Sequence, residues 1–400
     1  AYSVLRYITE KGMKNPIIIF TEGVYDDAIT MSGGFTVLGP KAGMNPNVPH
    51  GDPTKEWALS SERKIPTADE HFGEAVFRIE NAGSSGMRTF MDDTQTTDVQ
   101  TYLIDGVVFQ GNGTGVQDQG QKGSGSRNWY VQNCIFDDCH SLGARGGGVG
   151  LGFDRKGRNQ TYFKNLYVSN CYVINQNTTE LYSGHAASVN FNGVSVQNSA
   201  YPLCGKINCL QWQGQSTTVT NCHFWNAKEA TRENAIYFNL TWNQYCTSGL
   251  GNDEALFAAT FRNNSFYHVN NSKYSLIFFG AAGNTKVAVE ENMFVSEEGK
   301  DAKAPIDVKY ITLNGKVTHV GIGTYVDEVP VSADHLTVGD YKLTNDRFLV
   351  RNNTFVGTEF QALPTIGNNL HKETKVELMG NLYLDALDST EGKVIDPYVE

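Results

Sequence analysis

A short motif recurs along the chain and constrains its fold more than any other feature. Each copy is a run of strand-forming residues, then an asparagine, then a second such run, as in WYVQNCIF (129–136) and LYVSNCYV (166–173). The step from Asn170 to Asn198 recurs unchanged from Asn264 to Asn292 and again from Asn353 to Asn381. Strand-rich repeats of this length without a helical period indicate a β-solenoid, in which each coil contacts only its neighbours. The asparagines are Asn133, Asn170, Asn198, Asn221, Asn264, Asn292, Asn353 and Asn381.

The recurring asparagine has a physical explanation. Where the chain bends between two strands of a coil, one residue must leave β geometry, and asparagine tolerates the left-handed region well. Its amide can also pair with the amide of the next coil, about 4.8 Å away. We therefore predict an asparagine ladder, with Gly106 in the same place one repeat before Asn133. Cys134, Cys171 and Cys222 follow such asparagines directly and are predicted to stack as well.

The spacing of the motif also predicts the rest of each coil. The long interval from Asn292 to Asn353 is interpreted as two coils with one unit skipped, and the other long intervals as one coil plus a loop. The segment 48–73 breaks the strand pattern and is expected to cover the end of the stack. A loop-rich excursion is expected at about 296–346. Third strands, each opening the next coil, are predicted at 148–154, 187–193, 207–214, 234–242, 275–281 and 305–312.

Composition narrows the classes of partner. The net charge of −11 argues against nucleic acid, because phosphate binding needs a basic surface. The sequence has no run of about 18 apolar residues, so we expect no membrane span. The chain starts without the charged and apolar segments of an export signal, so we expect that any such signal was either removed or never present. The cysteines number seven, and although Cys204–Cys209 and Cys134–Cys139 are close enough to pair, free buried thiols are predicted.

Three segments resemble known proteins. The stretch NPIIIFTEGVYDDAITMSGGFTVLGPKAGMNPN (15–47) resembles the first coils of right-handed β-helix proteins of the pectin-lyase-like superfamily. The segments 261–299 and 350–357 are similar to β-helical repeats in exported polysaccharide-degradation proteins of gut Bacteroidota. The resemblance implies an all-β, right-handed parallel β-helix of about ten coils with an asparagine ladder. We place the cap and first coils at 1–90 and a single solenoid domain at 91–400.

The resemblance implies a fold but no single activity, because such coils host enzymes and non-catalytic proteins. The superfamily's lyase-like patterns W-I-D-H and R-x-P-R are absent, as are the polygalacturonase-like N-T-D and the esterase-like V-D-F-I-F-G. We expect a secreted or cell-surface protein, monomeric or homotrimeric, that binds an extended glycan. It is either a polysaccharide lyase or glycoside hydrolase, or a non-catalytic glycan-binding or adhesin-like scaffold.

Three charged loops, at 137–159, 179–185 and 228–234, hold the catalytic candidates. In a lyase, His185 or Lys156 is the candidate base, and Arg145, Arg232 or a Ca²⁺ ion the group that neutralises the uronate carboxylate. No other cofactor or metal is indicated. In a hydrolase, the candidate pair of carboxylates is Asp154 and Glu233. The alternative interpretation is an ordinary solvated loop surface.

The predicted binding surface consists of amides beside aromatic rings, a combination that suits sugars. Strand alternation buries residues such as Val189 and Phe191 and turns their neighbours outward. The alternative interpretation is an ordinary polar strand face. The substrate-binding candidates are Asn190, Asn192, Gln211, Gln213, Tyr237, Asn239, Trp242 and Tyr245.

Overall fold

The structure is a computed structural model that describes a set of segments spread over the whole chain. Apart from a helical turn near Tyr7, the secondary-structure elements in these segments are all strands. The described residues are 7–8, 10–26, 29–31, 33–46, 73–80, 85–89, 99–111, 113–118, 127–139, 164–174, 180–184, 188–198, 206–210, 215–226, 238–241, 257–267, 277–280, 285–299, 306–309, 312–313, 316–317, 329–330, 337–338, 341–342, 347–358, 365–366, 375–384 and 392–394.

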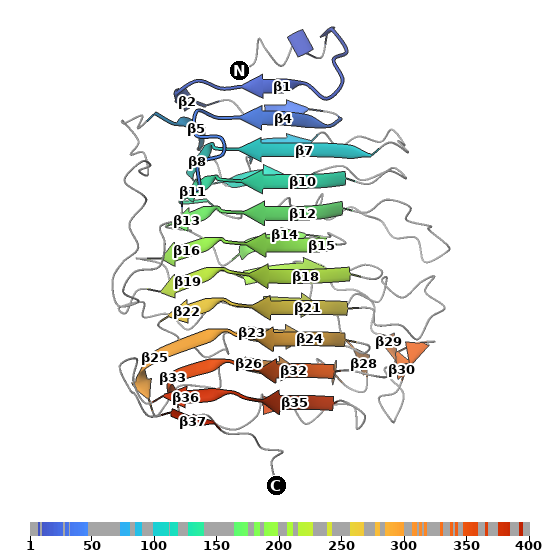
Figure 1. The fold of residues 1–400 in the computed structure, drawn as a ribbon. Helices are drawn as coiled ribbons and strands as arrows, with labels where there is room; N and C mark the ends of the chain where they lie inside the picture. Colours follow the sequence, from blue (N-terminus) through green and yellow to red (C-terminus); the bar gives the residue numbers. More distant parts are fainter. Residues whose placement is uncertain are drawn as a thin grey trace.

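The strands stack one above another into an elongated array, with β1 near one end and β37 at the other (Figure 1). Within the described residues, the main sheet has eleven strands, and all of its pairings are parallel. It consists of β1 (Ile17–Ile19), β4 (Phe35–Leu38), β7 (Gln100–Asp105), β10 (Arg127–Gln132), β12 (Lys164–Ser169), β15 (Ser188–Asn192), β18 (Gln215–Thr220), β21 (Phe257–Arg262), β24 (Thr285–Glu290), β32 (Arg347–Arg351) and β35 (Lys375–Met379).

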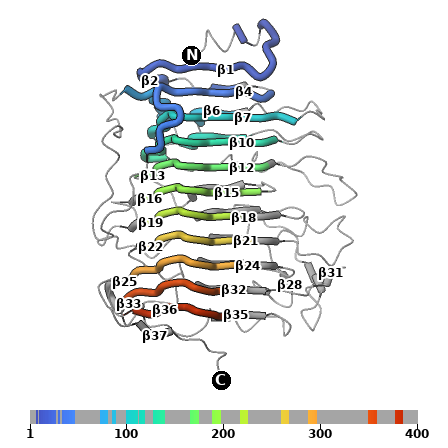
Figure 2. The backbone as a smooth tube through the Cα atoms, in the orientation of Figure 1, coloured from blue at the N-terminus to red at the C-terminus, as the bar shows by residue number. Residues whose placement is uncertain are grey.

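A second long sheet follows the first around each bend, and Figure 2 shows the backbone turning from one sheet into the other. Its strands are parallel except the last, β37, which pairs antiparallel with β36. It consists of β2 (Gly23–Tyr25), β5 (Ala75–Ile79), β8 (Val108–Gly111), β11 (Ile135–Asp137), β13 (Tyr172–Ile174), β16 (Ser195–Asn198), β19 (His223–Asn226), β22 (Ser265–Tyr267), β25 (Met293–Gly299), β33 (Thr354–Thr358), β36 (Leu382–Leu384) and β37 (Gly392–Val394).

Shorter parallel sheets supply a third strand in several coils. The predicted third strands near 207–214, 234–242, 275–281 and 305–312 coincide with strands of these sheets, whereas 148–154 lies outside the described residues. The short sheets consist of β3 (Ile29–Met31), β6 (Ser85–Thr89) and β9 (Thr114–Gln117); β14 (Glu180–Gly184), β17 (Lys206–Leu210) and β20 (Phe238–Thr241); and β23 (Ile277–Gly280), β26 (Ile306–Lys309) and β34 (Thr365–Ile366).

The long interval from Asn292 to Asn353 is a single step of the stack, contrary to the sequence prediction of two coils. Strand β24 pairs directly with β32 in the main sheet, and β25 pairs directly with β33 in the second sheet. Between β25 and β32 this coil contains its third strand, β26, and then five short strands with antiparallel pairing. These are β27 (Thr312–Leu313), β28 (Lys316–Val317), β29 (Val329–Pro330), β30 (Thr337–Val338) and β31 (Tyr341–Lys342).

The bend between the two long sheets requires a left-handed residue, as predicted. Gly106 and Asn133 occupy it with φ of 69° and 52°, and Asn170 and Asn221 do so in later coils. Asn198 does not, because it ends strand β16; Gly193, with φ of 65°, makes the bend of that coil instead. Glycine and asparagine adopt this conformation at little steric cost.

The predicted single column of asparagines is two neighbouring columns. In the later coils the left-handed residues are Asn263, Glu291, Asn352 and Gly380, each one residue before the asparagine that the motif picks out. That next residue points into the core. It is a cysteine at positions 134, 171 and 222, and an asparagine at 264, 292, 353 and 381. The motif therefore selected bend residues in the first coils and core residues in the last ones.

The core asparagines form a hydrogen-bonded chain that we call the buried asparagine row: Asn264, Asn292, Asn353 and Asn381. The Oδ1 atom of Asn292 accepts bonds from both the backbone N and the Nδ2 of Asn264, at 3.0 and 2.9 Å. The Nδ2 of Asn292 donates to the backbone oxygen of Phe261 and to the Oδ1 of Asn353. Buried amides are stable only when paired in this way, because the alternative is an unsatisfied polar group.

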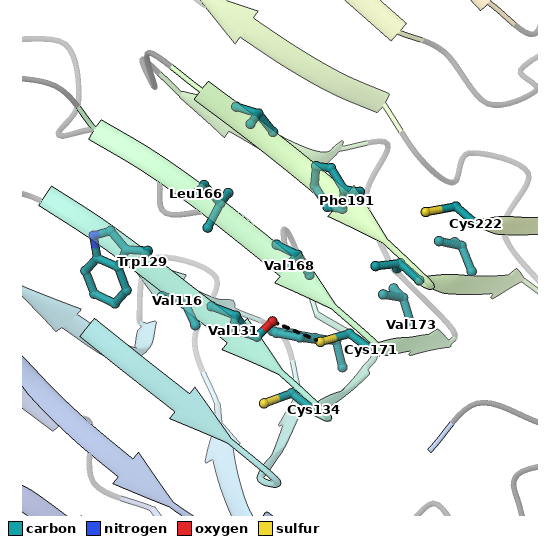
Figure 3. Packing of buried hydrophobic residues seen from close by; sticks show 14 of the residues in the cluster. Val116, Trp129, Val131, Cys134, Leu166, Val168, Cys171, Val173, Phe191 and Cys222 are labelled. Carbon is teal, nitrogen blue, oxygen red and sulfur yellow. Dashed lines mark hydrogen bonds between the residues drawn. The ribbon is translucent and has the colours of Figure 1, made fainter. Parts of the chain in front are cut away.

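Apart from such buried polar groups, most of the interior between the sheets is apolar, and its side chains stack from coil to coil. The rings of Phe224, Phe266, Phe294, Phe355 and Tyr383 follow one another with centroids 4.9 to 5.1 Å apart. In the earlier coils the thiols of Cys134, Cys171 and Cys222 point into the same core (Figure 3). These three thiols and that of Cys139 are free, so Cys134 and Cys139 do not pair.

Candidate functional site

The outward face of the main sheet carries the candidate site, on four consecutive strands. Alternation in β10 buries Trp129 and Val131 and turns Tyr130 outward, and the same pattern repeats in the next strands. We call this surface the amide–tyrosine strip. It consists of Asn128, Tyr130 and Gln132 of β10, Asn165, Tyr167 and Ser169 of β12, Ser188, Asn190 and Asn192 of β15, and Thr218 and Thr220 of β18.

Two stacked tyrosines form the apolar part of the strip. Tyr130 and Tyr167 are register partners, and their ring centroids lie 4.9 Å apart with the planes only 9° from parallel. Tyr130 is a large side chain with 38% of its surface exposed. Because the stacking already restrains both rings, the two tyrosine side chains lose little conformational entropy when a ligand packs against them.

Hydrogen bonds hold the amides of the strip beside the rings. The Nδ2 of Asn165 donates to Oδ1 of Asn128 across the two strands, at 2.8 Å. In β15, the Nδ2 of Asn190 donates to the Ser188 hydroxyl at 2.7 Å. Asn192 is exposed at the end of the strand, and its Oδ1 accepts bonds from Thr220 at 3.3 Å and from Asn221 at 2.8 Å.

The strip is uncharged, and the charges at its two ends are already engaged. Asp105, on β7, accepts hydrogen bonds from Gln132, Asn133 and the backbone N of Gly43. Arg262, on β21, forms a two-pronged pair with the Glu291 carboxylate at 2.9 and 3.1 Å. This pairing raises the pKa of Arg262 and lowers that of Glu291.

The structure divides the predicted binding residues between two surfaces. Asn190 and Asn192 lie in β15 of the main sheet and face outward, whereas Val189 and Phe191 of the same strand are buried. Asn239 lies in β20 of a third-strand sheet, where its register partner is Asn208 of β17. Segment 187–193 is therefore not a third strand, and the prediction that Asn190 and Asn192 share one strand column with Asn239 is wrong. Gln211, Gln213, Tyr237, Trp242 and Tyr245 lie outside the described residues.

The catalytic candidates lie outside the described residues as well: Arg145, Asp154, Lys156, His185, Arg232 and Glu233. Within the described part of the chain, no three His, Cys, Asp or Glu side chains are placed to hold a metal ion. The Ca²⁺ expectation is thus without a site among these residues.

The sequence prediction missed the two tyrosines, although a signal for them was available. Tyr130 and Tyr167 stand at the same distance before a bend asparagine, in consecutive copies of the motif. Aligned copies of a solenoid repeat place such residues side by side, so equal spacing from the asparagine predicts the stacked pair. The missed signal was the position of the tyrosines within the repeat.

The fold and the strip together define a parallel β-solenoid-like protein with an exposed polar and aromatic face. Comparison of the chain with models of protein families, with curated proteins and with solved structures finds no match in any of the three. Among the described residues, no helix has the length and apolar character needed to cross a membrane.

Proposed function

We propose that the protein is an exported glycan-binding protein that holds a polysaccharide on the amide–tyrosine strip. We further propose that the stack is a right-handed parallel β-helix of the pectin-lyase-like kind, similar to exported proteins of gut Bacteroidota. Two arguments support this architecture. Crossovers between parallel strands of one sheet are almost always right-handed, and the resemblance of 15–47 and 261–299 points the same way.

One observation carries the binding proposal: a stacked tyrosine pair, of which Tyr130 is exposed and Tyr167 half-buried, is surrounded by amide and hydroxyl side chains. Sugars present C–H groups that pack on aromatic surface and hydroxyls that need donors and acceptors. The four strands span about 14 Å, three steps of about 4.8 Å. That length suits a polymer better than a single sugar.

The experiment is affinity electrophoresis of the protein through gels that contain single polysaccharides, both neutral and acidic. We expect retardation by at least one polymer, weakened several-fold by Tyr130→Ala or Tyr167→Ala, because ring packing is worth roughly 0.5–1.5 kcal/mol. Tyr7→Ala is the matched control, since Tyr7 is an exposed tyrosine away from the strip. Unchanged retention in both strip variants would move the site elsewhere.

The same polymers distinguish binding from cleavage. A lyase would release unsaturated uronates that absorb in the ultraviolet, and a hydrolase would release new reducing ends. We expect retention without either product, because none of the eleven strip side chains is a carboxylate, histidine or lysine, and the two tyrosines are stacked on each other with no such group of the strip beside them. Appearance of either product would assign catalysis, and the candidates would then be Asp154, His185 and the other charged loop residues.

A further inference from the structure

Beside the strip, the bend residues Asn221 and Asn263 and the strand residue Asn192 form a second row of amides, exposed rather than buried. The Nδ2 of Asn263 donates to Oδ1 of Asn221 at 2.8 Å, and the Nδ2 of Asn221 donates to Oδ1 of Asn192 at 2.8 Å. The row crosses three neighbouring coils, and both bonds run in the same direction. It therefore ends on the amide nitrogen of Asn192, inside the strip.

This direction polarises the last amide. The Oδ1 of Asn192 accepts two bonds, from Asn221 and from the Thr220 hydroxyl. An amide whose oxygen accepts hydrogen bonds becomes a better donor, because chains of hydrogen bonds polarise one another. Among the described residues, no protein atom accepts a bond from the Asn192 Nδ2. A strengthened donor thus remains available at the surface.

The absence of charge on the strip restricts which ligand groups can accept a hydrogen bond from the Asn192 Nδ2. None of the eleven strip side chains carries a formal charge, and Arg262, at the edge of the strip, is committed to Glu291. A carboxylate or sulfate group on this surface would lose hydration without gaining a counter-charge, which is unfavourable. A hydroxyl, ether or carbonyl oxygen of an uncharged sugar costs much less to desolvate.

From the amide row and the uncharged strip we infer that the ligand is an uncharged polysaccharide, one of whose oxygens accepts a hydrogen bond from the Asn192 amide. The inference rests on the proposed function and names the substrate class of the same site. Because the interaction involves no ion pair, affinity should not depend on salt.

The test compares neutral glucans, galactans, xylans and mannans with acidic polygalacturonate and alginate, at low and at high NaCl concentration. We expect retention by a neutral polymer, equal at both salt concentrations. Asn192→Asp keeps the acceptor for Asn221 and Thr220 but removes the donor, so it should weaken binding at least tenfold. Asn221→Ala interrupts the row and should give a smaller loss. Thr260→Ala, on β21 beyond the strip, is the matched control, and circular dichroism checks that each variant folds.

The outcomes separate the two proposals. Salt-sensitive retention by acidic polymers alone, weakened by Tyr130→Ala, would overturn the inference and leave the proposed function standing. Full binding by Asn192→Asp would also overturn the inference. No retention by any polymer would overturn the proposed function itself, and the inference with it.

Discussion

At the scale of single residues, the fold uses asparagine in two different ways. Asn221 is exposed, adopts φ of 54° and pairs with the side-chain amides of Asn192 and Asn263. Asn292 is only 2% exposed and makes its bonds inside the core. The first role needs tolerance of the left-handed conformation. The second needs a side-chain amide that both donates and accepts hydrogen bonds, so that it can bond to the coils on either side.

This difference predicts unequal costs for the same substitution. Asn292→Ala leaves the backbone N of Asn264, the oxygen of Phe261 and two side-chain amides short of partners. We expect it to lower the free energy of unfolding by about 3 kcal/mol, since each buried unsatisfied group costs roughly 1–3 kcal/mol. Asn221→Ala loses only bonds to water-exposed partners but places alanine in the left-handed conformation, so it should cost about 1 kcal/mol. Urea denaturation measures both, and equal losses would contradict the two roles.

At the scale of elements, ion pairs link neighbouring strands on the outer face beyond the strip. Arg262, at the end of β21, pairs with Glu291, which follows β24, and Arg351 of β32 pairs with Glu290 at 2.7 Å. The hydrogen bonds from Arg262 lower the pKa of Glu291 from its ordinary 4.5. Each pair has at least one exposed member, so these pairs adjust stability slightly, while the parallel pairing and the core hold the strands together.

The lowered pKa of Glu291 sets the direction of a pH effect. A carboxyl group whose pKa falls on folding stabilises the protein above its unfolded pKa, and that contribution disappears as the pH falls through the folded value. Glu291→Gln should therefore melt slightly below the wild type at pH 7, and the difference should shrink as the pH drops below about 4. Scanning calorimetry measures this difference in melting temperature, and high salt should reduce the difference as well. If the difference in melting temperature stayed constant from neutral to acidic pH, the Arg262–Glu291 pair would not contribute to stability in the way proposed.

At the scale of the whole molecule, the stack contains a continuous core in which each coil covers the next. Cys134, Cys171 and Cys222 are all buried in this core, and each belongs to a different coil. Burial raises the pKa of Cys222 to about 12, so its thiol stays protonated at neutral pH. Reaction of these cysteines therefore reports opening of the stack.

We expect Cys134, Cys171 and Cys222 to resist iodoacetamide at mildly alkaline pH in the native protein and to react together once denaturant unfolds the stack. Neighbouring coils stabilise one another, so these interior coils should open at one denaturant concentration. Mass spectrometry of the peptides identifies each labelled cysteine among the seven in the chain. Labelling of Cys222 in the native protein would show that its coil opens locally.

The sequence by itself determined the parallel stack of strands, the bends at Gly106, Asn133 and Asn170, and the outward direction of Asn190 and Asn192. These follow from strand alternation and from the conformational preferences of glycine and asparagine, which are local. Only the tertiary structure decided the register between coils. The pairs Asn263–Asn264 and Asn352–Asn353 offer two asparagines for one bend, and only the bonds to adjacent coils distinguish the left-handed one from the buried one. The same contacts assigned 188–192 to the main sheet, because pairing between coils depends on residues far apart in the chain.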